Sequence, residues 1–122
     1  MNWLAIACGG AVGSLLRAAL ARWQPWPGLP LSILAANVLG SLAIGLLWAW
    51  CSSRAPQGLA WQALGVGLLG GFTTYSTFSL DVLRLLEVGR LGAALGYALA
   101  TLVLALAACG AGILLGRQLF PA

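Results

Sequence analysis

The sequence predicts an all-α integral membrane protein, with four helices in a single domain over residues 1–122. Hydrophobic residues make up 61% of the chain and charged residues only 7%, and the mean hydropathy is +0.99. A soluble domain carries about 25% charged residues. The third helix is predicted to be broken, because glycine and hydroxyl residues lie in the middle of its apolar stretch.

Four apolar stretches are long enough to cross a bilayer, which takes about 20 residues of helix. They cover about residues 3–21, 31–50, 62–84 and 91–116. Prolines and a glycine within 22–30 end the first helix. The segment 51–58 separates the second helix from the third, and a short turn at 87–90 precedes the fourth. A multi-pass membrane protein is therefore expected.

The arginines give only a weak preference for one orientation in the membrane. Four spans place both termini on one side, and the positive-inside rule compares the Lys and Arg residues near the two faces. One face carries four arginines, and the other carries two plus the N-terminal amine: Arg17, Arg22, Arg84 and Arg90 against Arg54 and Arg117. Insertion in both orientations and insertion in one orientation are both compatible with this distribution.

The segment Gly70–Phe78 is the expected interruption of the third span. Gly70 and Gly71 are followed by Thr73 and Thr74. Glycine costs backbone entropy in a helix, and threonine crowds the turn before it. Within a bilayer, a broken helix is tolerated only where protein or a water-filled path satisfies its polar backbone groups. We therefore expect a discontinuous span that lines a binding site or a pore.

Glycines recur at four-residue spacing and predict close packing of helices. The pairs are Gly9 and Gly13, Gly67 and Gly71, Gly92 and Gly96, and Gly112 and Gly116. Four tightly packed helices leave little room for a wide central channel. An aqueous site is expected between subunits instead.

Three kinds of polar side chain lie within the predicted spans. Asn37 is a carboxamide deep in the second span, where an amide needs a partner. It either lines a functional path or joins two helices. Tyr97 and Thr101 are four residues apart, so their hydroxyls share a helix face, and the same alternatives apply to them. Arg17 could reach the interface or attract anions at a pore mouth.

The chain contains no histidine or lysine and no carboxylate near mid-membrane. These absences disfavour proton coupling, which generally uses such groups, and enzymatic catalysis. The sparse arginines do not suggest nucleic-acid binding. Hydroxyl, amide and ring-edge groups can replace the water around a small hard anion, and Tyr75 and Phe78 are spaced to face one path.

A passive anion route is the expectation from these residues, and they do not distinguish fluoride from chloride. A coupled small-anion exporter and a non-transporting membrane scaffold are the alternatives.

Three segments resemble those of the CrcB/Fluc family of small fluoride channels. They are GGFTTYSTF over residues 70–78, GGAVGSLLR ending at Arg17, and AANVLGS around Asn37. The resemblance covers essentially the whole chain. It implies a fluoride-selective channel of the cell inner membrane that confers fluoride resistance. It also implies an antiparallel, dual-topology homodimer with two fluoride pathways and a structural sodium ion held by the backbone carbonyls of Gly70 and Thr73.

The resemblance also assigns the fluoride pathway. The matching positions are Arg17, Asn37, Tyr75, Ser76, Thr77, Phe78, Tyr97 and Thr101. Three positions depart from the family pattern. Tyr75 replaces the usual phenylalanine and adds a hydroxyl, Asp81 stands where glutamate is frequent, and Ala105 shortens the track of hydroxyls on the fourth helix.

Overall fold

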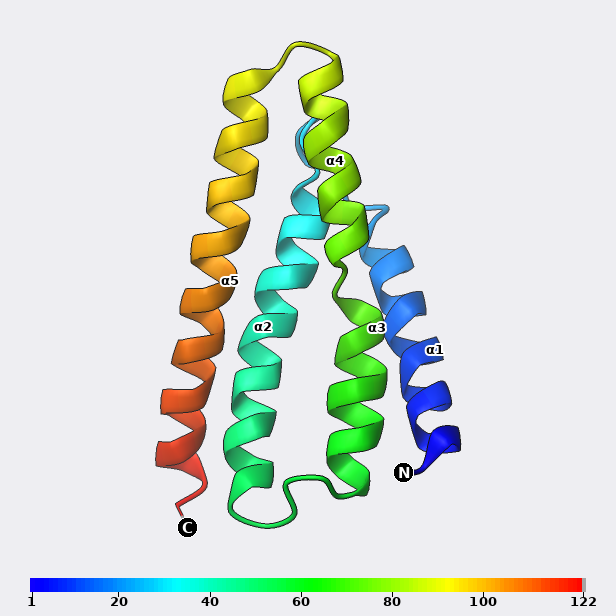
Figure 1. The fold of residues 1–122 in the computed structure, drawn as a ribbon, viewed down its shortest axis with the longest axis vertical. Helices are drawn as coiled ribbons and strands as arrows, with labels where there is room; N and C mark the ends of the chain where they lie inside the picture. The colour runs from blue at the N-terminus through cyan, green and yellow to red at the C-terminus, as the bar shows by residue number, and fades with distance from the viewer. Residues whose placement is uncertain (122) are drawn as a thin grey trace.

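The computed structural model describes residues 1–121, and within this range the chain folds into four helical columns (Figure 1). The all-α prediction is confirmed. Three columns are single helices: α1 (Trp3–Leu20), α2 (Leu31–Ser52) and α5 (Leu91–Leu119). The other column consists of three pieces in succession: the π-helical segment η1 (Trp61–Leu69), the one-turn α3 (Gly70–Phe72) and α4 (Tyr75–Glu87).

Both chain termini lie at the same end of the molecule, as four successive crossings require (Figure 1). The connection between α2 and η1 is at that end, and the turn between α4 and α5 is at the other. Helices α1, α2 and α5 are each long and apolar enough to cross a membrane. Together they make this a multi-pass membrane protein.

The helix boundaries differ a little from the predicted ones. Helix α2 continues to Ser52 and α5 to Leu119, whereas α1 ends at Leu20. The column predicted to cover 62–84 runs from Trp61 to Glu87 with a break inside it. Helix ends fray, and flanking polar residues continue a helix beyond its apolar stretch.

Side-chain caps and glycine turns set the ends of the helices. The Asn2 side chain accepts a hydrogen bond from the Ala5 N–H at 3.1 Å and so caps α1. Gly28 and Gly89 adopt φ values of +80° and +75° in the loops before α2 and α5, a region that favours glycine. The Arg90 guanidinium donates to the Gly28 carbonyl and ties these two loops together.

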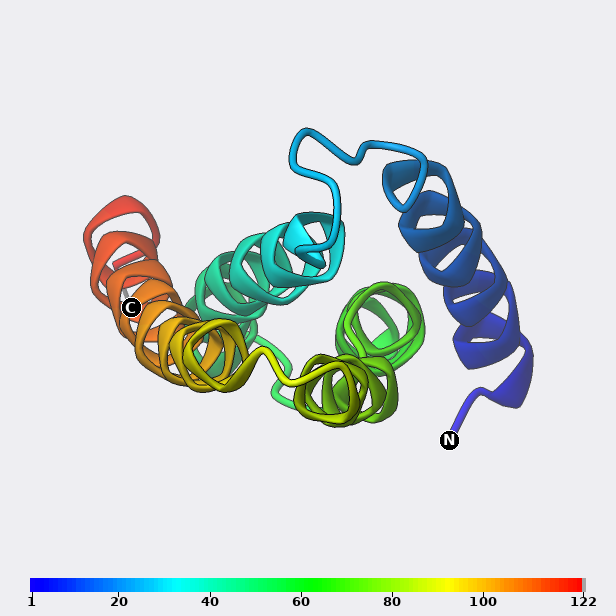
Figure 2. The ribbon, with the colours of Figure 1, turned by 90° about the horizontal axis from the view of Figure 1, so that it is seen from above.

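The third column lies between α1 and α2, and α5 packs along α2 on the side away from α1 (Figure 2). Glycines allow these contacts. A Cβ atom on Gly71 would lie 2.6 Å from the Gly10 carbonyl oxygen, and a Cβ on Gly13 would meet the Leu68 carbonyl. On the other side of the molecule, a Cβ on Gly112 would meet the Leu42 carbonyl of α2. The backbones of α1 and the third column therefore touch directly, and so do those of α2 and α5.

The prediction of glycine-mediated packing is wrong for one pair. A Cβ atom on Gly92 or Gly96 would have nothing within 4 Å among residues 1–121. The physical reason is that the face of α5 that carries Gly92 and Gly96 points away from the neighbouring columns of its own chain, whereas Ala94 and Tyr97 on another face are buried. Four-residue spacing shows that small residues share a face, but it does not show that another helix covers that face.

Candidate functional site

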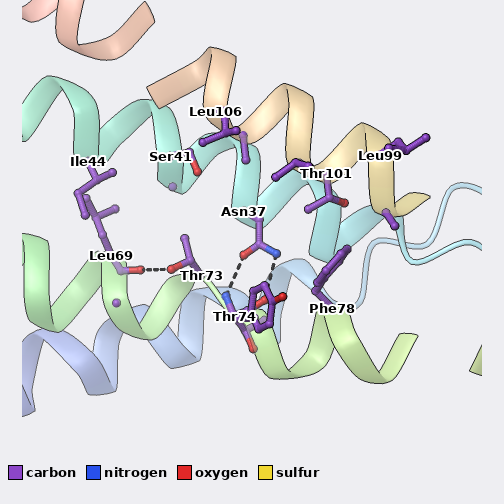
Figure 3. Close-up of a pocket in the computed structure, with 16 residues that line it drawn as sticks. Asn37, Ser41, Ile44, Leu69, Thr73, Thr74, Phe78, Leu99, Thr101 and Leu106 are labelled. Atoms are coloured by element: carbon purple, nitrogen blue, oxygen red, sulfur yellow. Dashed lines mark hydrogen bonds between the residues drawn. The ribbon is translucent and has the colours of Figure 1, made fainter. Parts of the chain in front are cut away.

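A cavity of about 550 Å³ opens between α2, the interruption of the third column and α5 (Figure 3). Apolar residues make up much of its wall, and a few polar side chains converge on it. The predicted pathway residues that line it are Asn37, Tyr75, Phe78 and Thr101, together with the sodium-site residues Gly70 and Thr73. Ser41, Thr74 and Ala105 also line it.

The helix is interrupted at Thr73 and Thr74, and not at the two glycines. Thr73 has φ −87° and ψ 156°, and Thr74 has φ −153° and ψ 123°, which are both extended conformations. Gly70 and Gly71 are helical. The break therefore lies inside the predicted interruption 70–78, at its two threonines and not at its two glycines. The lack of a side chain at Gly71 serves the contact with α1, as the short distances around it indicate, whereas Gly70 makes no such contact.

Asn37 stabilises the extended segment with two hydrogen bonds to Thr74. The Asn37 Nδ2 atom donates to the Thr74 carbonyl at 3.1 Å, and the Asn37 Oδ1 atom accepts from the Thr74 N–H at 2.8 Å (Figure 3). One amide thus replaces two helix hydrogen bonds. Because Nδ2 carries two hydrogens, Asn37 has a second donor beyond the one used here.

Thr74 has a second role as the N-cap of α4. Its Oγ1 atom accepts from the Thr77 N–H at 3.2 Å and donates to the Thr77 hydroxyl at 3.2 Å. The Thr74 hydroxyl also lies 3.3 Å from that of Ser76. We did not single out Thr74 as a site residue from the sequence. The preference of threonine for the position before a helix could have identified it.

Ser76 and Thr77, predicted to lie on the fluoride pathway, do not line the cavity. Ser76 is exposed, and Thr77 takes part in the cap of α4. Their hydroxyls belong to the first turn of a helix that begins beside the cavity. The structure therefore groups them with the interruption and not with the cavity wall.

Three aromatic rings run from the molecular surface to the interior. The Tyr75 and Phe78 ring centroids are 5.6 Å apart, and those of Phe78 and Tyr97 are 5.4 Å apart. Tyr75 is 81% exposed, whereas Tyr97 is 6% exposed and packs with Leu85 and Ala94. Phe78 is the ring between them and lines the cavity. Phe78 therefore borders the cavity with an aromatic ring, and the edge of such a ring carries partial positive charge.

Two buried hydroxyls of α5 make no hydrogen bond of normal geometry within residues 1–121. These are the Tyr97 phenol and the Thr101 Oγ1. Thr101 lines the cavity, and Tyr97 lies behind Phe78. Asp81 Oδ2 is also buried and lies close enough to the Tyr97 phenol to interact with it, so Thr101 is the hydroxyl with no polar neighbour of this kind in the described range. Buried polar atoms are nearly always satisfied in folded proteins, so each such atom calls for an explanation.

Arg17 does not line the cavity. Its Nε atom donates to the Gly71 carbonyl at 3.1 Å, in a half-buried position. Helix α1 lies on the side of the third column away from α5 (Figure 2). The structure thus brings Arg17 to the interruption from one side, while Asn37 reaches it from the other.

The chain is similar to known proteins over nearly its full length. The pattern of the family described as "CrcB-like protein, Camphor Resistance (CrcB)" matches residues 4–113. The fluoride-specific ion channel FluC of Paracoccus denitrificans is 47% identical over 121 residues, covering 98% of this chain and 97% of that protein.

Two other relatives bear the same name. FluC of Thermus thermophilus is 44% identical over 121 residues, covering 97% of this chain and 95% of that protein. FluC of Agrobacterium fabrum is 43% identical over 124 residues, covering 98% and 99%.

Proposed function

The chain belongs to the CrcB-like family, and we propose that it is a fluoride-specific ion channel that exports cytoplasmic fluoride passively. Its relatives are named as ion channels, so its function is transport and not catalysis. The observation that carries the proposal is the cavity beside the interruption. There the buried, unpartnered Thr101 hydroxyl lines the same cavity as Phe78 and Asn37.

The chemistry of these side chains suits a small anion with a tightly held hydration shell. The Thr101 hydroxyl and the second Nδ2 hydrogen of Asn37 can each donate to an anion in place of water. The edge of the Phe78 ring adds a weak positive field. The Tyr75 hydroxyl supplies a further donor at the surface of the chain. Apolar walls around these donors keep other water out.

An antiparallel homodimer of dual topology would complete the pore. The 81% exposed Tyr75 lines the cavity, so a second chain placed there would cover both the ring and the opening. The weak difference in arginine number between the two ends is compatible with insertion in both orientations. Since each chain has one such cavity, a dimer would have two pores, surrounded by lipid in the cell inner membrane.

A structural sodium ion fits the interruption. No hydrogen bond to the Gly70 or Thr73 carbonyl is made by residues 1–121. Carbonyl oxygens released from helix hydrogen bonding suit a hard cation. No cluster of three or more His, Cys, Asp or Glu in the described range could hold a metal instead. When bound, the ion would compensate the partial charges of these carbonyls, two from each chain of the dimer.

No coupling is needed for export. A membrane potential contributes about 2.3 kcal/mol per charge for each 100 mV, which drives a cytoplasmic anion outward when the inside is negative. Asn37, Thr101 and Phe78 then need only lower the cost of removing water from the ion.

Fluoride efflux from liposomes tests the function. Liposomes holding purified protein and fluoride are diluted into fluoride-free buffer, and a fluoride electrode follows release after a potassium ionophore shunts the potential. Rapid release that depends on the shunt, with chloride retained in parallel liposomes, is the expected result. Release that requires a proton or sodium gradient would indicate a coupled exporter. No release from folded dimers would indicate a non-transporting scaffold. Either of these results contradicts the channel.

A further inference from the structure

The interruption deprives the Gly71 carbonyl of its helical partner. In a continuous α-helix the N–H four residues later, that of Tyr75, would donate to it. Tyr75 instead begins α4 after the extended Thr74. The Gly71 carbonyl accepts from Arg17 Nε. This carbonyl lies at the C-terminal end of a helical segment, where the helix dipole favours a cation.

The close approach of α1 makes this hydrogen bond possible. Gly9, Gly13 and Arg17 are spaced by four residues and share one face of α1. Cβ atoms on Gly9 and Gly13 would overlap the carbonyls of Ala63 and Leu68. Arg17 is one turn beyond this contact, so its side chain reaches the third column where the helix breaks.

Polar side chains thus hold the interruption from two sides. From α1, Arg17 satisfies the Gly71 carbonyl, and from α2, Asn37 satisfies both backbone groups of Thr74. The third column lies between these helices (Figure 2). These bonds leave the Gly70 and Thr73 carbonyls available.

We propose that Arg17 is a positioning residue, which holds the interrupted helix through its Nε–H and does not act by drawing anions with its charge. The inference deepens the proposed function, because the interruption borders the cavity that we assign to fluoride. The hydrogen bond itself is a property of the fold and can be tested without any transport measurement.

Two substitutions separate the hydrogen bond from the charge. In Arg17→Gln, the side-chain amide nitrogen is attached to Cδ, as Nε is in arginine, so a donor is kept at the same depth while the charge is lost. In Arg17→Lys, a methylene takes the place of Nε, and the charge is kept at the end of the chain. Arg22, an exposed residue outside the cavity, provides the matched control pair Arg22→Gln and Arg22→Lys.

Amide hydrogen exchange of the full-length protein in detergent micelles is the primary measurement. The relevant peptides cover residues 69–77, which include the Thr74 N–H bound to Asn37 and the Thr77 N–H bound to Thr74. We expect Arg17→Lys to raise exchange about tenfold or more, because it removes the Nε–H donor whose hydrogen bond holds the segment closed. Arg17→Gln should remain within a few-fold of the parent protein, as should both Arg22 variants.

Two other patterns of amide exchange protection in these variants would overturn the proposal. Protection kept in Arg17→Lys but lost in Arg17→Gln would show that charge, and not the Nε donor, is what matters. Unchanged protection in both would show that the bond does not hold the segment. If Arg17→Lys fails to fold, Arg17→Gln decides alone, since loss of protection in it contradicts the proposal.

Fluoride efflux and sodium-dependent thermal unfolding of the same variants connect the bond to the pore. We expect both efflux and the sodium-induced rise in unfolding temperature to be greater in Arg17→Gln than in Arg17→Lys. A parent protein without fluoride efflux would refute the proposed function, while the exchange data would still decide the role of Arg17. Efflux that is higher in Arg17→Lys would overturn the role proposed here.

Discussion

Asn37 and Thr101 are equally buried polar side chains of the same cavity, but they differ in their hydrogen bonding. Each is 8% exposed. Asn37 makes two hydrogen bonds to the backbone of Thr74, whereas the Thr101 hydroxyl makes none within residues 1–121. Leaving a buried polar group unsatisfied costs about 1–3 kcal/mol. The difference shows that Asn37 supports the backbone, and it supports our proposal that the Thr101 hydroxyl donates to an ion.

Replacing Thr101 by valine should separate stability from transport. Thr101→Val keeps the shape of the side chain and removes the unsatisfied hydroxyl, so we expect the unfolding temperature to stay the same or rise. Fluoride efflux should fall about tenfold or more, since one donor to the dehydrated ion is lost. Thr101→Ser keeps the hydroxyl and should retain most of the efflux. Parent-level efflux in Thr101→Val would exclude a role for this hydroxyl.

Replacing Asn37 by aspartate should affect stability and transport together. Asn37→Asp exchanges the Nδ2 donor for an acceptor that faces the Thr74 carbonyl, so one hydrogen bond becomes a repulsion. We expect a loss of about 1–3 kcal/mol in the free energy of unfolding and near-complete loss of efflux. Gln118→Glu, the same kind of change at an exposed amide outside the cavity, is the control. Normal stability and normal efflux in Asn37→Asp would contradict both the support of the Thr74 backbone by Asn37 and its role in fluoride transport.

At the scale of helices, direct backbone contact between α1 and the third column positions the interruption. A Cβ on Gly13 would meet the Leu68 carbonyl and also lie 2.9 Å from the Phe72 amide nitrogen. Neither backbone atom can rotate away as a flexible side chain would. The helices would have to separate, and the separation would draw Arg17 away from Gly71.

Gly13→Ala should therefore be far more disruptive than its small size suggests. We expect it to lower the free energy of unfolding by about 1–3 kcal/mol, the usual range for overpacking, and to reduce efflux. Gly92→Ala, at a glycine with open space around it, is the matched control and should be near neutral. Thermal unfolding in micelles measures the stability of both variants. Equal effects of the two substitutions would mean that the α1 contact does not position the interruption.

Much at this scale could be predicted from sequence. Apolar length located the helices within a few residues, because a bilayer requires about 20 apolar residues per crossing. Prolines and glycines located the loops, where Gly28 and Gly89 do adopt positive φ. Asn37 was also expected to need a partner, since an unsatisfied amide in lipid is costly.

The detail of the interruption could not be predicted, because tertiary contacts decide it. Local propensity marks Gly70 and Gly71 as the weakest helix formers, yet both stay helical, and Gly71 packs against α1. The break occurs where the Asn37 amide can bind the backbone of Thr74, 37 residues away in sequence. The hydrogen bond of Arg17 could likewise not be predicted, because its acceptor, the Gly71 carbonyl, is distant in sequence and is free to accept only once the helix is broken.

At the scale of the whole molecule, the arginines at the two ends give each chain only a weak preference for one orientation in the membrane. The difference of four arginines against two is small, so few substitutions suffice to force one orientation. Glu87→Lys with Gln24→Lys makes the count six against two. Arg22→Gln with Ser53→Lys, Gln57→Lys and Gln118→Lys makes it three against five. The substituted residues are all exposed and lie outside the cavity.

If the channel is an antiparallel dimer, each biased variant should fail alone and the two should function together. A biased population inserts in one orientation and lacks opposite partners, whereas coexpression supplies both orientations. Growth of fluoride-sensitive cells in fluoride measures function, and labelling of a cysteine added at the C-terminus measures orientation. Glu87→Gln with Gln24→Asn, at the same positions without added charge, is the control and should function alone. Full function of either biased variant by itself, with its orientation shown to be uniform, would contradict the antiparallel arrangement, because same-facing chains cannot place two cavities in opposite directions.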